Sequence, residues 1–292
     1  MTIDLQEYTR QTRLLDGAWG TQLERKGLPS GMPPDLWNLQ QPEIIEELAR
    51  SYVEAGSDII LTNTFGANRY ALERHDASDK VEDIARKGVE ISQKAAGTDA
   101  RVFASIGPTG KIVMMEEISR EDFRSAFEES AKAICEAEPD AIVLETFNEL
   151  EELEFALQTV KECCDLPVVA SVSYTAGEDG MKTMMGNSPE QLVEMAKENG
   201  ADAIGANCGI GPGIYVKIAR RYRELSDLPV WIKPNAGAPE TGPDGETVFP
   251  LGPEEFADFV PDLLEATVNF IGGCCGTTPD HIREIGKKLR NS

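Results

Sequence analysis

The chain has 292 residues, enough for one large domain with a substantial hydrophobic core. Its 28 Lys and Arg face 51 Asp and Glu, a formal net charge of -23, which excludes the basic surface that nucleic acids or anionic lipids require. No apolar run reaches the roughly eighteen residues of a membrane span, no signal peptide is visible, and six cysteines are too few for a disulfide scaffold, so we expect a soluble protein of the reducing cytoplasm.

Eight short apolar runs punctuate the chain, and such runs are typical of strands that are buried in a parallel sheet. In chain order they are Arg13–Asp16, Asp58–Asn63, Val102–Gly107, Ala141–Glu145, Val168–Ser173, Ala203–Asn207, Val230–Lys233 and Val268–Gly272.

Stretches with helical spacing separate most of these runs. Pro42–Gly56 has apolar residues on one face, Ser119 and Ser188 begin helices with capping boxes, and Thr278 begins a final helix over Asp280–Leu289. Alternation of strands and helices predicts an α/β fold, a single (β/α)8 barrel over residues 1–292, with a doubly wound open sheet as the alternative. The long irregular segment Asn235–Pro250 is predicted to be an active-site loop.

Barrel enzymes place their chemistry at the carboxyl ends of the strands, where polar or sulfur-bearing residues interrupt every apolar run of this chain. These residues are Asp16, Asn63, Thr64, Pro108, Thr109, Glu145, Thr146, Ser173, Tyr174, Cys208, Asn235, Cys274 and Cys275. Their regular placement predicts a site at this end of the barrel.

The thiols of Cys208, Cys274 and Cys275 follow two different strands, and together they predict a metal site. Three thiolates bind Zn2+ and leave its fourth position open, which suits the activation of an incoming thiol and alkyl transfer to its sulfur. The alternative for Cys274 and Cys275 is an incidental or redox-active vicinal pair.

The other cysteines and both histidines have simpler interpretations. Cys135 lies on a predicted helix and is expected to be a small core residue, while Cys163 and Cys164 end a helix and are expected to be structural. His75 lies in a charged stretch and His281 in the last helix, so neither is expected to bind a metal.

Two carboxylates at strand ends, Asp16 (with Gly17 beside it) and Glu145, are candidates for binding the ammonium group of a ligand. Helix capping or surface charge is the alternative for both. The backbone amides around Thr109 could bind a carboxylate, or the segment could be an ordinary turn.

Six segments, in the same order, make the chain resemble the homocysteine S-methyltransferase family over nearly its whole length. They are Asp16-Gly-Ala-Trp-Gly-Thr21, Leu61-Thr-Asn-Thr-Phe65, Glu145-Thr-Phe147, Ala206-Asn-Cys-Gly209, Pro234-Asn-Ala-Gly237 and Gly272-Gly-Cys-Cys-Gly-Thr-Thr-Pro279. The last segment is highly specific, and Pro234–Gly237 is most similar to the homocysteine-binding domain of cobalamin-dependent methionine synthase.

The resemblance implies a (β/α)8 barrel with Cys208, Cys274 and Cys275 as zinc ligands, and Asn235 as the fourth ligand before substrate arrives. It further implies that homocysteine is bound through Asp16, Gly17 and Glu145, with Thr109 as a weaker candidate. We therefore expect these residues to lie together at one end of the barrel.

The implied reaction moves a methyl group to L-homocysteine and produces L-methionine. Because the chain stops at Ser292 without folate or cobalamin modules, methylcobalamin would be carried by a separate corrinoid protein. The alternatives are a small donor such as S-methylmethionine, a betaine or a sulfonium compound, another thiol or selenol as acceptor, and a non-catalytic module that docks a corrinoid protein.

Overall fold

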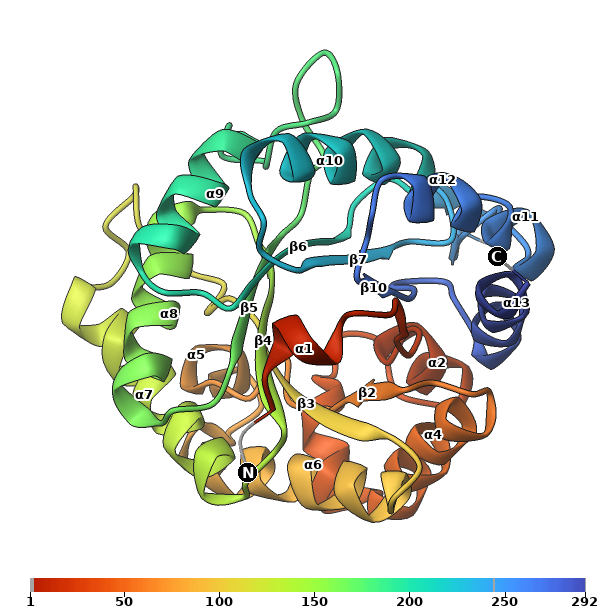
Figure 1. Cartoon of the computed structure of the whole chain (residues 1–292). Helices are drawn as coiled ribbons and strands as arrows, with labels where there is room; N and C mark the ends of the chain where they lie inside the picture. The colour runs from red at the N-terminus through yellow and green to blue at the C-terminus, as the bar shows by residue number, and fades with distance from the viewer. Residues whose placement is uncertain (1–2, 244, 292) are drawn as a thin grey trace.

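The computed structural model describes residues 3–243 and 245–291, and in this part of the chain eight parallel strands form one sheet in the order β1-β10-β7-β6-β5-β4-β3-β2. Figure 1 shows these strands around a central axis with helices outside them. The strands are β1 (Arg13–Leu14), β2 (Ile59–Leu61), β3 (Arg101–Ile106), β4 (Ala141–Phe147), β5 (Val168–Val172), β6 (Ala203–Cys208), β7 (Val230–Pro234) and β10 (Phe270–Ile271).

The helices follow the strands and form the outer layer, apart from the first helix, which precedes β1. They are α1 (Leu5–Tyr8), α2 (Gly20–Arg25), α3 (Trp37–Gln40), α4 (Pro42–Glu54), α5 (Arg69–Glu73), α6 (Val81–Ala96), α7 (Arg120–Glu136), α8 (Leu150–Cys163), α9 (Pro189–Glu198), α10 (Pro212–Leu225), α11 (Pro253–Ala257), α12 (Val260–Glu265) and α13 (Pro279–Arg290), with short 3-10 turns η1 (Pro34–Leu36) and η2 (Ser78–Lys80). The predicted capping boxes at Ser119 and Ser188 are present, and both helices begin there because the serine and a side chain three residues later bond each other's backbone N–H groups.

The two end strands, β1 and β2, meet through a short seam rather than a full ladder. The Asp58 N–H donates to the Leu14 carbonyl at 2.8 Å, and the Asp58 carboxylate accepts from the Leu14 N–H at 2.8 Å. The seam closes the sheet on itself. The predicted (β/α)8 barrel is therefore confirmed, and the open doubly wound sheet is wrong.

Aromatic rings fill the inside of the barrel. The Phe103 and Trp231 ring centroids are 6.0 Å apart, and the Trp231 and Phe270 centroids 5.2 Å apart. Leu5 of α1 packs into the same cluster, and α1 lies across the barrel opening in Figure 1. Because strand residues point alternately inward and outward, this apolar core occupies the inside of the barrel. The polar strand ends are left at the carboxyl end.

The predicted irregular segment Asn235–Pro250 contains a small hairpin, which the sequence interpretation missed. In the described part of the segment, β8 (Glu240–Thr241) pairs with β9 (Thr247–Val248) in an antiparallel manner. The segment still leaves from the end of β7 and returns to the barrel, since the Leu251 N–H donates to the Ala236 carbonyl at 3.0 Å.

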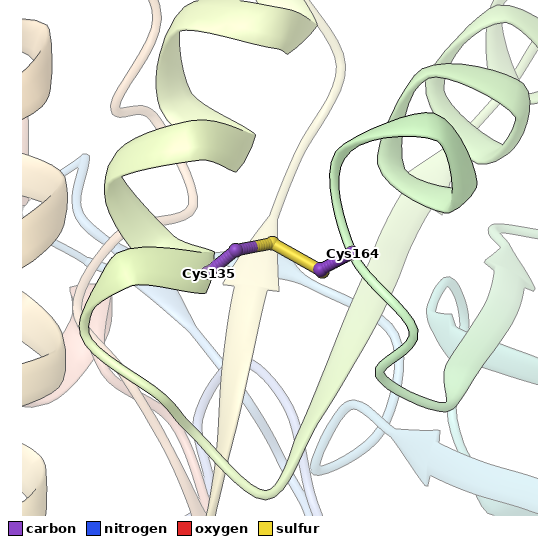
Figure 2. Close-up of a disulfide and its surroundings, with 2 residues drawn as sticks. All are labelled: Cys135 and Cys164. Carbon is purple, nitrogen blue, oxygen red and sulfur yellow. A yellow bond between two sulfur atoms is a disulfide. The ribbon is translucent and has the colours of Figure 1, made fainter.

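A disulfide joins Cys135, at the end of α7, to Cys164, just after α8 (Figure 2). Cys135, expected as a small core residue, packs against the core and is also half of a disulfide that the sequence interpretation did not foresee. Helices α7 and α8 pack side by side, and their carboxyl ends bring the two Cα atoms to 6.2 Å. Cys163 remains a free thiol beside the bond. Among the described residues, no helix has the length and apolar character needed to cross a membrane.

Candidate functional site

The three predicted metal-binding thiols converge at the carboxyl end of the barrel. Cys208 ends β6, and Cys274 and Cys275 follow β10, on either side of β7. Backbone hydrogen bonds join both segments to β7: the Asn235 N–H donates to the Cys208 carbonyl at 3.1 Å, and the Cys274 N–H to the Pro234 carbonyl at 2.7 Å. As a result, the three Sγ atoms lie within 4.8 Å of one another.

The backbone around the thiols is tightly packed and partly strained. Cys208 has φ of 64°, a left-handed conformation that costs a residue with a Cβ atom about 1 kcal/mol or more. A Cβ atom on Gly273 would lie 2.4 Å from Thr277 Cγ2, and one on Gly276 would lie 2.4 Å from Phe249 Cβ. The two glycines beside the cysteine pair therefore permit an approach that no other residue allows.

Asn235 contributes a buried acceptor to the same place. Its Nδ2 donates to the Gly209 carbonyl at 2.6 Å, and its Oδ1 has no hydrogen-bond partner among the described residues. A buried carbonyl oxygen without a partner costs about 1–3 kcal/mol, so this atom is suited to a ligand. The Asn235 N–H donates to the Cys208 carbonyl at 3.1 Å, which places the residue at the cysteine cluster.

The thiols influence one another's ionisation. Hydrogen bonds from Cys274 and Cys275 lower the pKa of Cys208 to about 3, and the contact with Cys208 in turn raises the pKa of Cys274 to about 12. Contacts with Cys208 and Cys274 raise the pKa of Cys275 as well. The Cys208 thiolate is thus stabilised by the two other thiols. Ionisation of Cys274 and Cys275 as well would require a cation that stabilises the added negative charge.

Glu145 lies buried near the carboxyl end of β4, the end of the barrel that carries the cysteines. The Ser105 hydroxyl donates to its Oε1 at 2.5 Å and the Asn207 amide donates to its Oε2 at 3.2 Å. Burial raises the pKa of Glu145 to about 7, against the opposing effect of the Lys233 ammonium. Each carboxylate oxygen keeps lone pairs for a further donor.

Asp16, the second predicted carboxylate, is fully buried and forms an ion pair with Lys233. Its Oδ2 also accepts from Trp19 Nε1 at 2.9 Å and from the Leu61 N–H at 2.8 Å. The carboxylate therefore already has three donors, and it bridges β1 to β2. Neither of the sequence alternatives, helix capping or surface charge, describes it.

Lys233 is a site residue that the sequence analysis missed. It lies in β7 between apolar neighbours, its side chain is 3% exposed, and the charges of Asp16 and Glu145 raise its pKa against the effect of burial. The sequence did contain an indication of this role: a lysine in an apolar run that predicts a buried strand needs an acidic partner.

Asn207, the residue before Cys208, is another residue that the sequence left unassigned. Its Oδ1 accepts from the Thr146 N–H at 2.9 Å and from the Ser171 hydroxyl at 2.8 Å, while its Nδ2 donates to Thr146 Oγ1 at 2.6 Å. These bonds connect β4, β5 and β6. Asn207 thereby fixes the irregular end of β4, where Glu145 leaves the ladder.

Gly17 and Thr109 occupy tight positions at the same end of the barrel. A Cβ atom on Gly17 would lie 2.8 Å from Tyr52 Cε1. The Thr109 N–H and hydroxyl both donate to Glu152 Oε1, at 2.7 and 2.6 Å. The Thr109 amide, which the sequence offered as a carboxylate donor, is therefore engaged by a buried glutamate of α8.

The residue pattern of the homocysteine S-methyltransferase family matches residues 13–289 of this chain. Methionine synthase of Mycobacterium tuberculosis is 32% identical over 294 residues, which cover 94% of this chain and 24% of that protein. Methionine synthase of Mycobacterium leprae is 31% identical over 299 residues, which cover 96% and 24%. The chain thus spans about a quarter of the length of these curated relatives.

Among solved structures, the metallated form of the homocysteine methyltransferase MmuM from Escherichia coli resembles the chain with a TM-score of 0.79. The identity is 22%, and the match covers 97% of this chain and 98% of that one. At this identity the likeness supports the barrel fold.

Proposed function

We propose, on the premise that this chain belongs to the homocysteine S-methyltransferase family, that it transfers a methyl group to the sulfur of L-homocysteine and forms L-methionine. The observation that carries the proposal is the convergence of three thiols within 4.8 Å at the end of the barrel where enzymes of this fold act. Residues 1–292 would act as one barrel domain.

We propose Zn2+ as the metal of this site. Three cysteine thiolates are a preferred zinc ligand set, and the unpartnered Asn235 Oδ1 supplies a fourth donor before substrate arrives. Zinc, when bound there, would lower the pKa of the homocysteine thiol so that it reacts as a thiolate. Cys208, Cys274 and Cys275 would be the lasting ligands, and Asn235 the one that yields to the substrate.

The amino-acid end of homocysteine is assigned to Glu145, Asp16 and Gly17. Thr109 is the weaker candidate, because its N–H and hydroxyl already donate to Glu152. Glu145 is the best placed for the ammonium group, because its two donors leave lone pairs and an added cation would favour its ionised form. Asp16 would contribute to substrate binding indirectly. Its carboxylate already has three donors, and it holds Lys233 and the junction of β1 and β2 in place. These contacts would place the sulfur at the cysteine cluster, and such positioning supplies much of the rate in a group transfer.

A methyl group carried as methylcobalamin on a separate corrinoid protein remains our favoured donor. Large apolar side chains are exposed on loops that follow the strands at this end of the barrel, as a docking surface for a protein would require. They are Phe65, Met114, Met115, Met184, Ile210 and Val248. The sulfur–methyl bond would form as the methyl–donor bond breaks, after the thiol proton is released to water.

The rival hypotheses are a small donor (S-methylmethionine, a betaine or another sulfonium compound), a different thiol or selenol acceptor, and a non-catalytic module that docks a corrinoid protein. Each rival changes one component of the assay. The small-donor hypothesis predicts turnover without a corrinoid, the acceptor hypothesis predicts a preference for another thiol, and the docking module predicts no turnover at all.

A donor screen tests the proposal. Zinc-loaded protein and homocysteine would be offered methylcobalamin, methyltetrahydrofolate, S-methylmethionine, S-adenosylmethionine and betaines in turn, and methionine would be measured by mass spectrometry. We expect methionine from at least one donor. The absence of methionine with every donor, despite a full complement of zinc, would contradict a catalytic role.

The matched variants are Cys208→Ala and Cys163→Ala. Loss of one of three thiolates should abolish zinc retention and turnover, whereas Cys163, a free thiol at the far end of α8, should be dispensable. Circular dichroism should show both variants folded. A Cys208→Ala protein that retained metal and full turnover would refute the assignment.

A further inference from the structure

His281, which the sequence placed outside any site, is the third residue of α13 and is 5% exposed. Its Nδ1 accepts from the Thr278 N–H at 3.2 Å, and Thr278 Oγ1 lies 3.0 Å from the same nitrogen. Its Nε2 lies 3.0 Å from the Leu251 carbonyl oxygen. The ring thus links the start of α13 to the end of the long segment that follows β7.

These contacts determine the form of the ring. A backbone N–H only donates, so Nδ1 must carry a lone pair, and a carbonyl only accepts, so Nε2 must carry the proton. His281 is therefore a neutral imidazole protonated at Nε2. A second proton would have to reside on Nδ1, facing the Thr278 N–H, and would break that hydrogen bond.

The two bonds of His281 complete a closed path of hydrogen bonds that passes through the Cys275 backbone. The Ala236 N–H donates to the Cys275 carbonyl at 2.9 Å, and the Leu251 N–H donates to the Ala236 carbonyl at 3.0 Å. His281 then joins the Leu251 carbonyl to Thr278, three residues beyond Cys275. One side of this path carries Asn235 and the other carries the cysteine pair.

We propose that His281 is a positioning residue of the thiol site, which holds the segment after Asn235 against Cys275 and Thr278 as a neutral imidazole. Any effect of His281 on zinc binding rests on the proposed function, whereas its positioning of the segment does not. Capping of α13 alone would need only Nδ1. Helix capping does not explain the contact between Nε2 and the Leu251 carbonyl.

Burial supports this assignment, because it lowers the pKa of His281 and so favours the neutral ring. Burial is the largest effect; the hydrogen bond to the Leu251 carbonyl and the Asp280 carboxylate oppose it by raising the pKa, and Arg25 adds to it by lowering the pKa. Phe256 of α11 covers one side, with its ring edge-on at 5.7 Å.

Two substitutions separate the roles of the two ring nitrogens. His281→Asn retains an acceptor near the Nδ1 position and should still cap α13, as Asp122 caps α7 in this same chain. It loses the donor to Leu251. His281→Gln retains a donor near the Nε2 position and should restore the link. His75, exposed in the loop after α5, gives the matched control His75→Asn.

The first measurement is amide hydrogen exchange at Ala236 and Leu251 by NMR in the metal-free protein. We expect exchange at least about tenfold faster in His281→Asn than in the wild type, with His281→Gln and His75→Asn close to the wild type. The second is zinc affinity by chelator competition, where loosening of the segment that carries Asn235 should weaken binding about tenfold in His281→Asn alone.

Unchanged exchange and unchanged zinc affinity in His281→Asn would overturn the inference. So would a wild-type imidazole NMR spectrum with the proton on Nδ1. If the wild type bound no zinc but His281→Asn still exchanged faster than the wild type, the proposed metal would be refuted and the positioning role would stand. If His281→Asn failed to fold, the tautomer of the wild-type ring would still test the inference.

Discussion

At the scale of single residues, the site is organised by buried polar groups that satisfy one another. Lys233 and Asp16 illustrate this, since an ammonium 3% exposed pairs with a carboxylate 0% exposed. Their attraction offsets the cost of desolvation only while both are present. Removal of one partner leaves an uncompensated charge inside the barrel.

Lys233→Met should therefore lower the free energy of unfolding by about 3–5 kcal/mol. The double variant Asp16→Asn, Lys233→Met should recover part of this loss, because it removes the stranded charge. Urea denaturation measures both. Lys87→Met, which removes an exposed partner of Glu90, is the control and should change stability by less than about 0.5 kcal/mol. Equal effects in the Lys233 and Lys87 variants would contradict a buried ion pair.

At the scale of elements, helix pairs and loops are joined by bonds that the strand–helix alternation does not indicate. Glu152 of α8 anchors Thr109 after β3, and Glu149 beside it accepts from the Val113 and Met114 N–H groups at 2.8 and 2.9 Å. The start of one helix thus holds the neighbouring loop on the site's side of the barrel. At the carboxyl ends of α7 and α8, the Cys135–Cys164 disulfide joins the two helices.

The disulfide should stabilise the oxidised protein mainly by restricting the unfolded chain. For cysteines 29 residues apart, Cys164→Ser should lower the free energy of unfolding by about 3–4 kcal/mol. With excess dithiothreitol, wild type and variant should become nearly equal. Mass spectrometry of alkylated peptides checks the pairing; six alkylated cysteines in the oxidised protein would show that the bond does not form.

At the scale of the whole molecule, the barrel core and the thiol site are separate structures. Phe103, Trp231 and Phe270 fill the inside of the barrel, while the cysteines lie on the segments that leave it. We therefore expect the barrel to fold without a metal. A metal bound at the thiols would add stability because the native state would bind the ion and the unfolded chain would not.

Zinc at about 1,000 times its dissociation constant should raise the free energy of unfolding by about 4 kcal/mol. Chelation should remove this increment and leave a cooperatively folded barrel. Thermal melts followed by circular dichroism at 222 nm test both statements. Cys208→Ala should show no increment and Cys163→Ala the full one; an apo protein without a cooperative transition would contradict the separation of core and site.

The sequence by itself determined the barrel, the eight strand positions and the placement of Cys208, Cys274 and Cys275 at strand ends. Periodicity and strand-end position are local properties, and parallel topology brings equivalent ends to one edge. Even the helix starts at Ser119 and Ser188 could be predicted, because a capping box lies within four residues.

Tertiary structure alone decided which partner each buried polar group found. Lys233 meets Asp16 across 217 positions, Cys135 meets Cys164 because two helices pack together, and His281 reaches Leu251 because a long segment returns to the barrel. A sequence shows that a buried charge, thiol or imidazole needs a partner. Only the folded chain shows which one lies within bonding distance, because these interactions act over about 3 Å whatever the separation along the chain.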